Sequence, residues 1–437
     1  MKKKDVLKSI IVEFNSWDLP AVIDREIELP LDSNKIISVV GSRRAGKTYL
    51  LFKTIKRLLN SGVDKKRCLY FNFEDERVDL IQEDLDLILH AYRELYPERD
   101  LRETYFFFDE VQNVNGWERF VRRIYDTITK RIFITGSNSK LPGDEIATSL
   151  RGRTLKYKVY PLTFREFLKF KGFEFNPPND FYNSKKKAML IKLFKEFLVY
   201  GGFPEITLLP GDLRLRSLQE YFNVMVYRDV VERYSVRGAF ILKYFIKRLA
   251  ENVTNSFSVN KIYNELKSKG VKIGKNTLYD YLEYLETCYL IRLIKRHFNS
   301  VLKSDLGEKK IYFIDNGLLN AIRAFNSSNL DALLENLVWR ELISKHDRII
   351  FFKGKRECDF IIDDKIAVQV CYDLSNTETR KREIEGLTEC CKYLHLREGF
   401  IITFDDEETL IKDDVKIHVL PAYKLAILGI LYPGYNV

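Results

Sequence analysis

The feature that most constrains this chain is the octapeptide Gly41–Thr48, which reads G-S-R-R-A-G-K-T. It follows a short apolar, β-branched run, Lys35–Val40, and precedes a run with helical apolar spacing, Tyr49–Ile55. Strand, glycine-rich loop and helix in this order form the context in which the G-x-x-x-x-G-K-[ST] motif binds nucleoside phosphates. The sequence therefore predicts an α/β fold built around a phosphate site.

The residue types of this loop suit a nucleoside triphosphate. The glycines let backbone N–H groups surround the β-phosphate, and the helix N-terminus adds its positive end. We expect Lys47 to bridge the β- and γ-phosphates and Thr48 to hold Mg²⁺. The predicted cofactors are therefore ATP and Mg²⁺. The predicted phosphate-binding residues are Gly41, Ser42, Arg43, Arg44, Ala45, Gly46, Lys47 and Thr48.

Two acidic residues follow a second apolar run. Tyr105–Phe108 contains four consecutive aromatic residues, which suits a strand covered on both faces of a parallel sheet. Asp109 and Glu110 come directly after it. We expect Asp109 to bind Mg²⁺ through water and Glu110 to polarise the water that attacks the γ-phosphate. The alternative is a strand that ends in solvated acids.

A third run, Lys130–Thr135, is also expected to be a strand, and the residues after it read G-S-N-S. A polar group at the end of this strand can position the attacking water beside the γ-phosphate. Ser137 and Asn138 are equal candidates for that role. The alternative is a simple turn.

These motifs together resemble the AAA+ ATPases. More narrowly, the chain resembles the archaeal and bacterial ATPase family in which an AAA+ module precedes a winged helix and a nuclease-like domain. The resemblance covers most of the chain and is carried further by F-N-F-E-D at 71–75, G-W-E at 116–118, S-L-R-G-R at 149–153, P-L-T-F-R-E-F at 161–167, G-G-F-P-E at 201–205, R-D-V-V-E-R-Y at 228–234 and Y-F-I-D-N-G-L at 312–318. It implies a P-loop AAA+ parallel-sheet sandwich over 1–160, a helical lid over 161–238, a winged-helix domain over 239–330 and a restriction-endonuclease-like α/β domain over 331–437.

The resemblance also implies an arginine finger. Arg151 and Arg153 precede the next expected strand, Thr154–Tyr160. In AAA+ folds this position holds the arginine that reaches a neighbouring subunit's ATP and neutralises charge on the transferred phosphoryl group. The expected protein is therefore a homo-oligomer with its sites at subunit interfaces. The alternative is an arginine that closes a turn around Gly152.

The net charge of +10 is unevenly spread along the chain. Residues 240–312 contain 14 Lys and Arg against 7 Asp and Glu, whereas 331–437 contain 15 against 20. A basic middle and an acidic end indicate that only part of the chain follows a phosphate backbone. The expected partner of the basic part is DNA, and branched DNA is one candidate form.

The sequence of residues 240–312 predicts three helices followed by a hairpin, which is typical of a winged helix. In such a fold the N-terminal part of the recognition helix meets the DNA groove. The predicted DNA contacts are Lys272, Lys275, Asn276 and Thr277 at that helix, and Arg292, Lys295 and Arg296 on the hairpin 291–313. The alternative is a winged helix that contacts only proteins.

Restriction-endonuclease-like folds hold Mg²⁺ with a helix glutamate, a hairpin aspartate and an E-x-K or Q-x-K pair. Glu335 or Glu341 is the helix candidate, Asp359 the hairpin candidate and Gln369 the third. Cys371 stands where the lysine belongs, and a thiol cannot supply the lysine's charge. We therefore expect an inactive nuclease-like domain, unless a relocated lysine such as Lys353 or Lys365 restores it.

Two functions follow from these features. The first is a Mg²⁺-dependent ATPase that binds, remodels or translocates DNA. The second is a nucleotide-gated switch that hydrolyses ATP slowly and acts on protein partners. The chain contains no run of about 18 apolar residues, and no long apolar segment follows Met1–Asp5. We therefore expect no secretory signal, no membrane contact and a cytoplasmic location. Abundant Lys and Glu beside only four Gln indicate a thermophilic source. The resemblance to an archaeal and bacterial family implies an archaeal one.

Overall fold

The computed structural model describes residues 2–137, 150, 152–298, 300, 307–323 and 329–429. The chain divides into two compact units. The first unit runs to Tyr160 and includes Thr287–Tyr289, and the second contains the remainder. Apart from Thr287–Tyr289, the residues predicted to form a lid, a winged helix and a nuclease-like domain thus belong to one compact unit.

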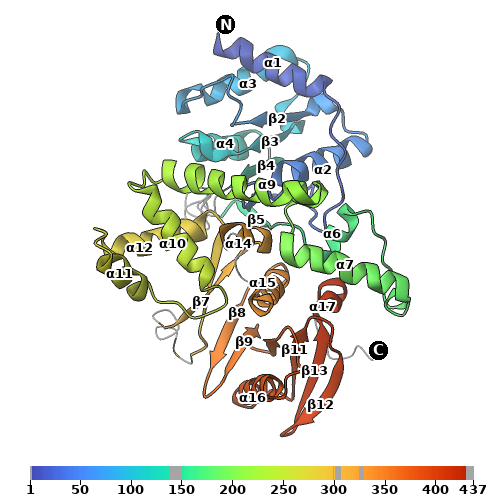
Figure 1. Cartoon of the computed structure of the whole chain (residues 1–437). Coiled ribbons are helices and arrows are strands. Elements are labelled where there is room, and N and C mark those ends of the chain that lie inside the picture. Colours follow the sequence, from blue (N-terminus) through green and yellow to red (C-terminus); the bar gives the residue numbers. More distant parts are fainter. Residues whose placement is uncertain are drawn as a thin grey trace. The chain divides into compact units, whose positions relative to one another are not determined.

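The first unit is a parallel sheet with helices packed on it (Figure 1). Its strand order is β2-β3-β4-β1-β5, and every neighbouring pair is parallel. The strands are β1 (Ile36–Gly41), β2 (Cys68–Asn72), β3 (Tyr105–Asp109), β4 (Ile132–Gly136) and β5 (Thr154–Val159). The helices are α1 (Lys3–Ser16), α2 (Lys47–Asn60), α3 (Leu85–Leu95) and α4 (Trp117–Thr127). The predicted α/β fold with a parallel sheet is confirmed.

The central strands of this sheet are buried on both faces, as their apolar sequences predict. Phe107 stacks on Phe133, with 4.7 Å between ring centroids, in the core that α2 also enters. Phe108 instead contacts Phe120 of α4 at 5.7 Å. Because β1, β3 and β4 are parallel, the loops that follow them meet at one edge of the sheet. That edge contains the predicted phosphate loop and both predicted acids.

The second unit begins with helices and a two-stranded hairpin. The helices are α6 (Phe164–Phe170), α7 (Ser184–Tyr200), α8 (Pro204–Leu208), α9 (Gly211–Val224), a π-helix (Met225–Glu232), α10 (Ala239–Glu251), α11 (Val259–Ser268), α12 (Lys275–Thr287) and α14 (Asn316–Arg323). The antiparallel hairpin is β6 (Ile291–Lys295) with β7 (Lys309–Phe313). Ser258 caps α11 through its side chain, as its position before the helix predicts. Within the described residues, no helix is both long and apolar enough to cross a membrane.

The second unit ends in a six-stranded sheet with order β12-β13-β11-β10-β9-β8. The strands are β8 (Ile349–Lys353), β9 (Glu357–Ile362), β10 (Ile366–Val370), β11 (Glu398–Thr403), β12 (Glu408–Lys412) and β13 (Val415–Pro421). The helices are α15 (Leu330–Leu342), α16 (Thr377–Tyr393) and α17 (Ala422–Leu428). Strands β8–β10 form an antiparallel meander, and α16 makes the crossover to the parallel strand β11.

The β6–β7 hairpin packs against this sheet. The backbone N–H of His297 donates to the carbonyl of Phe351 in β8 at 2.7 Å. Tyr312 of β7 stacks on Trp339 of α15 at 5.1 Å and contacts Phe360 of β9 at 5.6 Å. The predicted wing and the C-terminal sheet therefore share a core.

Candidate functional site

The predicted phosphate loop joins β1 to α2. Its first residue lies against β5, because a Cβ atom on Gly41 would stand 1.9 Å from the carbonyl oxygen of Val159. Gly46 has a φ of +96° and directly precedes α2, which has no side-chain cap. The first N–H groups of the helix thus remain available to an anion. Arg25 donates to the carbonyl of Ala45 at 2.7 Å and ties the loop in place.

Lys47 is a buried cation at this loop. Its Nζ atom lies 3.3 Å from the Gly41 carbonyl oxygen, 3.1 Å from that of Ser42 and 3.3 Å from a carboxylate oxygen of Glu110. The hydroxyl of Ser42 is buried and has no hydrogen-bond partner among the described residues. A buried ammonium beside an unpartnered hydroxyl and open helix N–H groups fits a phosphate group.

Asp109 stands at the carboxyl end of β3, within hydrogen-bond reach of Thr48. It also accepts hydrogen bonds from the hydroxyls of Tyr70, at 2.9 Å, and of Thr135. Burial raises the pKa of Asp109, and the negative charge of Glu110 raises it further. A divalent cation would offset both effects, so the Thr48 hydroxyl and the Asp109 carboxylate fit a Mg²⁺ site.

Glu110 is held in a left-handed backbone conformation, with φ +52°. Its N–H donates to the Thr135 hydroxyl at 2.9 Å, and Gln112 donates to its carboxylate at 2.6 Å. Burial raises the pKa of Glu110, but Lys47 and Gln112 outweigh burial, so its pKa is lower than usual. The carboxylate therefore stays ionised and can accept a hydrogen bond from water.

The residues proposed to complete this site are only partly described. The Ser137 hydroxyl accepts from Gln112 at 3.3 Å, which places it beside Glu110. Arg153 pairs with Asp126 of α4 at 2.9 Å. Asn138 and Arg151 lie outside the described residues. The finger and the water-positioning roles stay predictions.

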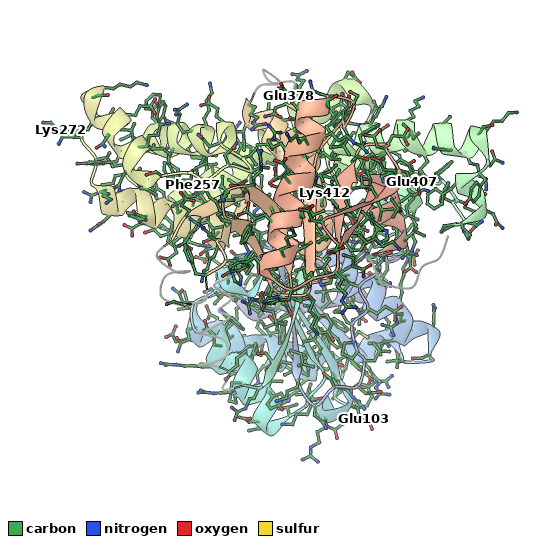
Figure 2. The ribbon with its side chains drawn as sticks, turned by 90° about the horizontal axis from the view of Figure 1, so that it is seen from below. Glu103, Phe257, Lys272, Glu378, Glu407 and Lys412 are labelled. Carbon is green, nitrogen blue, oxygen red and sulfur yellow. The ribbon has the colours of Figure 1, made fainter. Side chains whose placement is uncertain are left out.

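The predicted DNA contacts fall into two groups. Lys272, Lys275, Asn276 and Thr277 lie at the start of α12, and Figure 2 shows Lys272 at the outer edge of its helical region. Lys272 and Lys275 are exposed and have no carboxylate partner among the described residues. On the hairpin, Lys295 is exposed, whereas Arg292 pairs with Glu286 at 4.0 Å. Arg296 donates to the Lys353 carbonyl.

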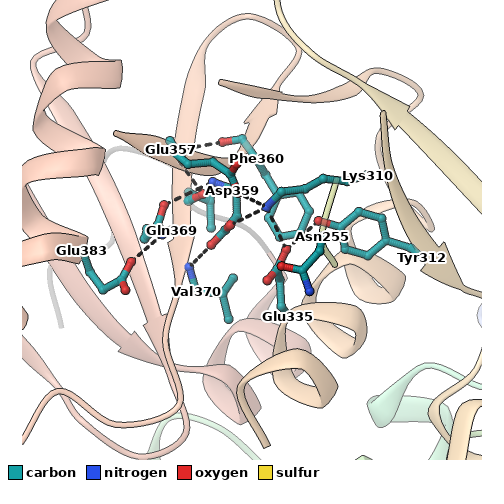
Figure 3. Close-up of polar contacts among 12 residues, drawn as sticks. Asn255, Lys310, Tyr312, Glu335, Glu357, Asp359, Phe360, Gln369, Val370 and Glu383 are labelled. Atoms are coloured by element: carbon teal, nitrogen blue, oxygen red, sulfur yellow. Dashed lines mark hydrogen bonds and ion pairs between the residues drawn. The ribbon is translucent and has the colours of Figure 1, made fainter. Parts of the chain in front are cut away.

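Two of the predicted nuclease-like residues, Glu335 and Asp359, contact a lysine from the hairpin, and the third, Gln369, bonds Asp359 (Figure 3). The Nζ atom of Lys310 in β7 lies 2.9 Å from Asp359, 3.3 Å from Glu335 and 2.6 Å from Glu357. Gln369 accepts from the backbone N–H of Asp359 at 3.1 Å. Burial opposes the charge on Lys310, but the carboxylates outweigh burial and raise its pKa well above the usual value. We call Lys310, Glu335, Glu357, Asp359 and Gln369 the ionic cluster.

The structure also separates the alternatives that the sequence leaves open. Glu335 faces the ionic cluster, whereas Glu341 accepts from the backbone N–H of Phe164 at 2.9 Å. Neither lysine suggested as a replacement lies in the cluster. Lys353 pairs with Glu308 at 2.7 Å, and Lys365 is exposed. The lysine at this position is Lys310, which sequence reasoning placed on a DNA-binding wing.

Sequence reasoning also missed three polar residues around the two acids, namely Tyr70, Gln112 and Thr135. One signal was available for Thr135, because it is the next-to-last residue of a strand adjacent to β3. Side chains at the carboxyl ends of neighbouring parallel strands meet at the ligand edge of the sheet.

The fold and the loop geometry define a P-loop nucleotide-binding domain. Residues 33–168 match a family model described as an AAA domain, and residues 191–329 match a domain of unknown function, DUF8612. The chain is 40% identical over 421 residues to an uncharacterized protein of Methanocaldococcus jannaschii, across 93% of this chain and 91% of that protein. It is 30% identical over 379 residues to an uncharacterized protein of Haemophilus influenzae, across 84% and 88%. The chain belongs to the family of these two proteins.

Among solved structures, the chain is similar to Cdc6p from Pyrobaculum aerophilum. The match has 14% sequence identity and a TM-score of 0.25, and it covers 77% of this chain and 94% of that one.

Proposed function

We propose that the protein is a Mg²⁺-dependent ATPase of the AAA+ type that couples ATP binding and hydrolysis to the binding and remodelling of DNA. The observation that carries the proposal is the meeting of Lys47, Thr48, Asp109 and Glu110 at one edge of a parallel sheet. Thr48 and Asp109 would hold Mg²⁺, which neutralises charge on the β- and γ-phosphates when it is bound.

The chain's own residues supply the other parts of hydrolysis. Lys47 neutralises the phosphates, and the first N–H groups of α2 surround them. Glu110 now pairs with Lys47 at 3.3 Å. A γ-phosphate at Lys47 would compete for the ammonium and leave the Glu110 carboxylate free to orient water. Gln112, bonded to Glu110 at 2.6 Å, keeps the carboxylate in position.

ATP binding and steady-state hydrolysis by the purified full chain test this proposal. Lys47→Ala should lose nucleotide binding or turnover, because the cation that pairs with the phosphates is gone. Lys56→Ala, on the same helix, is the matched control and should retain both. Unchanged hydrolysis by Lys47→Ala would refute the assignment of this site.

The DNA part of the proposal is supported by charge and topology. Residues 240–312 have a net charge of +7, and three helices followed by a hairpin have the order of a winged helix. Lys272 and Lys275 stand where a recognition helix begins. Since phosphate contacts carry no sequence information, binding should be strong at low salt and similar for all sequences.

A second candidate function is a nucleotide-gated switch that acts on a protein partner. The pairing of Arg292 and Arg296 within the chain favours it, because these residues are then less available to phosphates. Binding to duplex, forked and four-way DNA separates the two candidates. Tight, salt-dependent binding supports the first, and its absence supports the second.

We further propose that the C-terminal part has a restriction-endonuclease-like arrangement. The order α15, β8, β9, β10, α16, β11 and the meeting of Glu335, Asp359 and Gln369 support it. A cytoplasmic homo-oligomer, with Arg151 or Arg153 acting on a neighbouring subunit's ATP, completes the proposal. Sedimentation of the full chain with and without ATP tests the assembly.

A further inference from the structure

The donor atoms of the ionic cluster do not fit a Mg²⁺ site, although a nuclease-like arrangement implies one. Asp359 places one carboxylate oxygen on Lys310, at 2.9 Å, and the other on the N–H of Val370, at 2.9 Å. The Gln369 carbonyl oxygen accepts from the N–H of Asp359. The Glu335 oxygen that faces Lys310 also accepts from the Tyr312 hydroxyl at 2.6 Å. Each candidate ligand residue thus already bonds the protein (Figure 3).

The Lys310 ammonium contacts the two carboxylates that would bind Mg²⁺ in a nuclease-like site. It lies between the helix carboxylate Glu335 and the hairpin carboxylate Asp359. Cys371 stands where the nuclease-like pattern has its lysine, and a thiol supplies no positive charge. The Cys371 thiol instead donates to the Asp373 carbonyl at 3.2 Å. In the described part of the chain, no set of three or more acidic, His or Cys side chains is arranged to hold a metal ion.

We propose that Lys310 replaces the divalent cation of the nuclease-like site, and that the ionic cluster joins the β6–β7 hairpin to the C-terminal sheet instead of cleaving DNA. The inference rests on the nuclease-like arrangement proposed above and is independent of ATP hydrolysis. Its basis is that one buried ammonium contacts carboxylates from two other elements, α15 and β9.

The charges around the ammonium agree with this role. The exposed fraction of the side chain is 7% for Asp359, 13% for Glu335 and 37% for Glu357, so one partner of the cation is buried, one is partly buried and one lies at the surface. Glu383, next in the chain of contacts, accepts from Gln369 at 2.5 Å. It also pairs with Arg382 at 2.6 Å, so it does not compete for Lys310. Lys310 is therefore the cation that Glu335, Glu357 and Asp359 share.

Burial of Lys310 limits which hairpin residues can contact DNA. Lys310 is 2% exposed at its side chain, so it cannot reach a DNA phosphate while the cluster is intact. The hairpin residues beside it are fixed to the C-terminal sheet as well, through Arg296 and the carbonyl of Lys353. Any DNA contact by residues 240–312 then depends on α12 more than on β7.

Mn²⁺ binding, counted by electron paramagnetic resonance without nucleotide, tests the replacement. All chains carry Asp109→Asn, which removes the proposed metal ligand of the P-loop site. We expect Lys310→Ala to bind one Mn²⁺ more than the parent chain, and further addition of Asp359→Asn to abolish that site. Lys309→Ala, on the same strand, is the matched control and should bind no extra ion.

Two outcomes would overturn the proposal. One is a parent chain that already binds a Mn²⁺ which Asp359→Asn removes. The other is a folded Lys310→Ala chain that gains no Mn²⁺, because the ammonium would then not occupy a cation position. If Lys310→Ala does not fold, the parent chain decides the question alone, and absence of Asp359-dependent binding supports the proposal. ATP hydrolysis does not enter either readout, so failure here is distinct from failure of the ATPase proposal.

A thermal measurement adds an independent readout. A ligand that binds only the folded state stabilises that state by RT ln(1 + [L]/Kd) and so raises the melting temperature of the protein. Mn²⁺ should therefore raise the melting temperature of the Lys310→Ala chain and leave that of Lys309→Ala unchanged. Equal shifts in the two variants would contradict a cation site opened by removal of Lys310.

Discussion

Replacing Lys310 by Met should destabilise the second unit, because the change keeps most of the side-chain volume and removes the charge. Breaking a buried ion pair from one side typically costs about 3–5 kcal/mol. Glu357, with 37% of its side chain exposed, regains hydration and adds little. Glu335 can take up a proton, so most of the cost falls on Asp359, whose side chain is 7% exposed. We therefore expect the low end of that range, about 3 kcal/mol.

Differential scanning calorimetry of the full chain measures this loss. For domains of this size a loss of 1 kcal/mol lowers the melting temperature by roughly 2–4 °C, so a decrease of about 6–12 °C is expected for the second unit. Lys309→Met is the control, and Lys310→Met with Asp359→Asn should recover much of the stability. If Lys310→Met and Lys309→Met melt at the same temperature, the ionic cluster does not stabilise the fold.

The loss should also depend on pH. Burial and the negative charge of Asp359 together raise the pKa of Glu335 from 4.5 to about 8, although Lys310 and Tyr312 oppose the shift. The folded state thus favours the protonated form, so its contribution to stability is complete below pH 4.5 and disappears as pH rises to about 8. Without Lys310 the ionised form is still less favoured. Glu335 stays protonated in both folded chains well below pH 8, so the melting difference between Lys310→Met and the wild type should widen as pH rises through about 8. A difference that stays constant through that range would contradict this account.

Three further predictions concern the nucleotide and DNA sites. Glu110→Gln should bind ATP as the wild type does but hydrolyse it roughly 10²-fold more slowly or worse, measured by phosphate release; lost ATP binding in a folded chain would indicate a structural role. If Arg153 is the finger, Arg153→Ala should bind ATP but hydrolyse it about 10³-fold more slowly. Mixing this variant with Lys47→Ala should restore part of the hydrolysis, whereas a monomer with full activity would refute a trans role. Reversing Lys272 and Lys275 to Glu should weaken binding to all DNA sequences alike and reduce the log–log salt slope by roughly 2, whereas Lys365→Glu with Lys412→Glu should not.

The geometry of the phosphate loop and of the adjacent acids could be predicted because its signals are local. Eight consecutive residues specify the loop, and a buried strand that ends in Asp109-Glu110 specifies the acidic edge. Parallel strand order then brings the two segments together without further information. The hydrogen bonds of Tyr70, Gln112 and Thr135 could not be predicted, because they depend on strand neighbours and side-chain directions that the sequence does not state.

The ionic cluster shows where sequence reasoning ends. Glu335, Asp359 and Gln369 were predictable from a resemblance, and they do meet. Lys310 was not, because in a basic hairpin a buried lysine has the same pattern as an exposed one. Its burial is set by a helix and a strand that lie 25 and 49 residues further along the chain. Only the packing of the hairpin on the C-terminal sheet identifies it as the partner of these carboxylates.

The central claim is that the P-loop site hydrolyses ATP and that DNA influences the reaction. The most direct measurement is the ATP hydrolysis rate of the full chain with Mg²⁺, alone and with duplex, forked or four-way DNA, beside Lys47→Ala. We predict Mg²⁺-dependent hydrolysis that at least one DNA structure changes and that Lys47→Ala lacks. Hydrolysis no faster than that of Lys47→Ala, with every DNA and with none, would contradict the account.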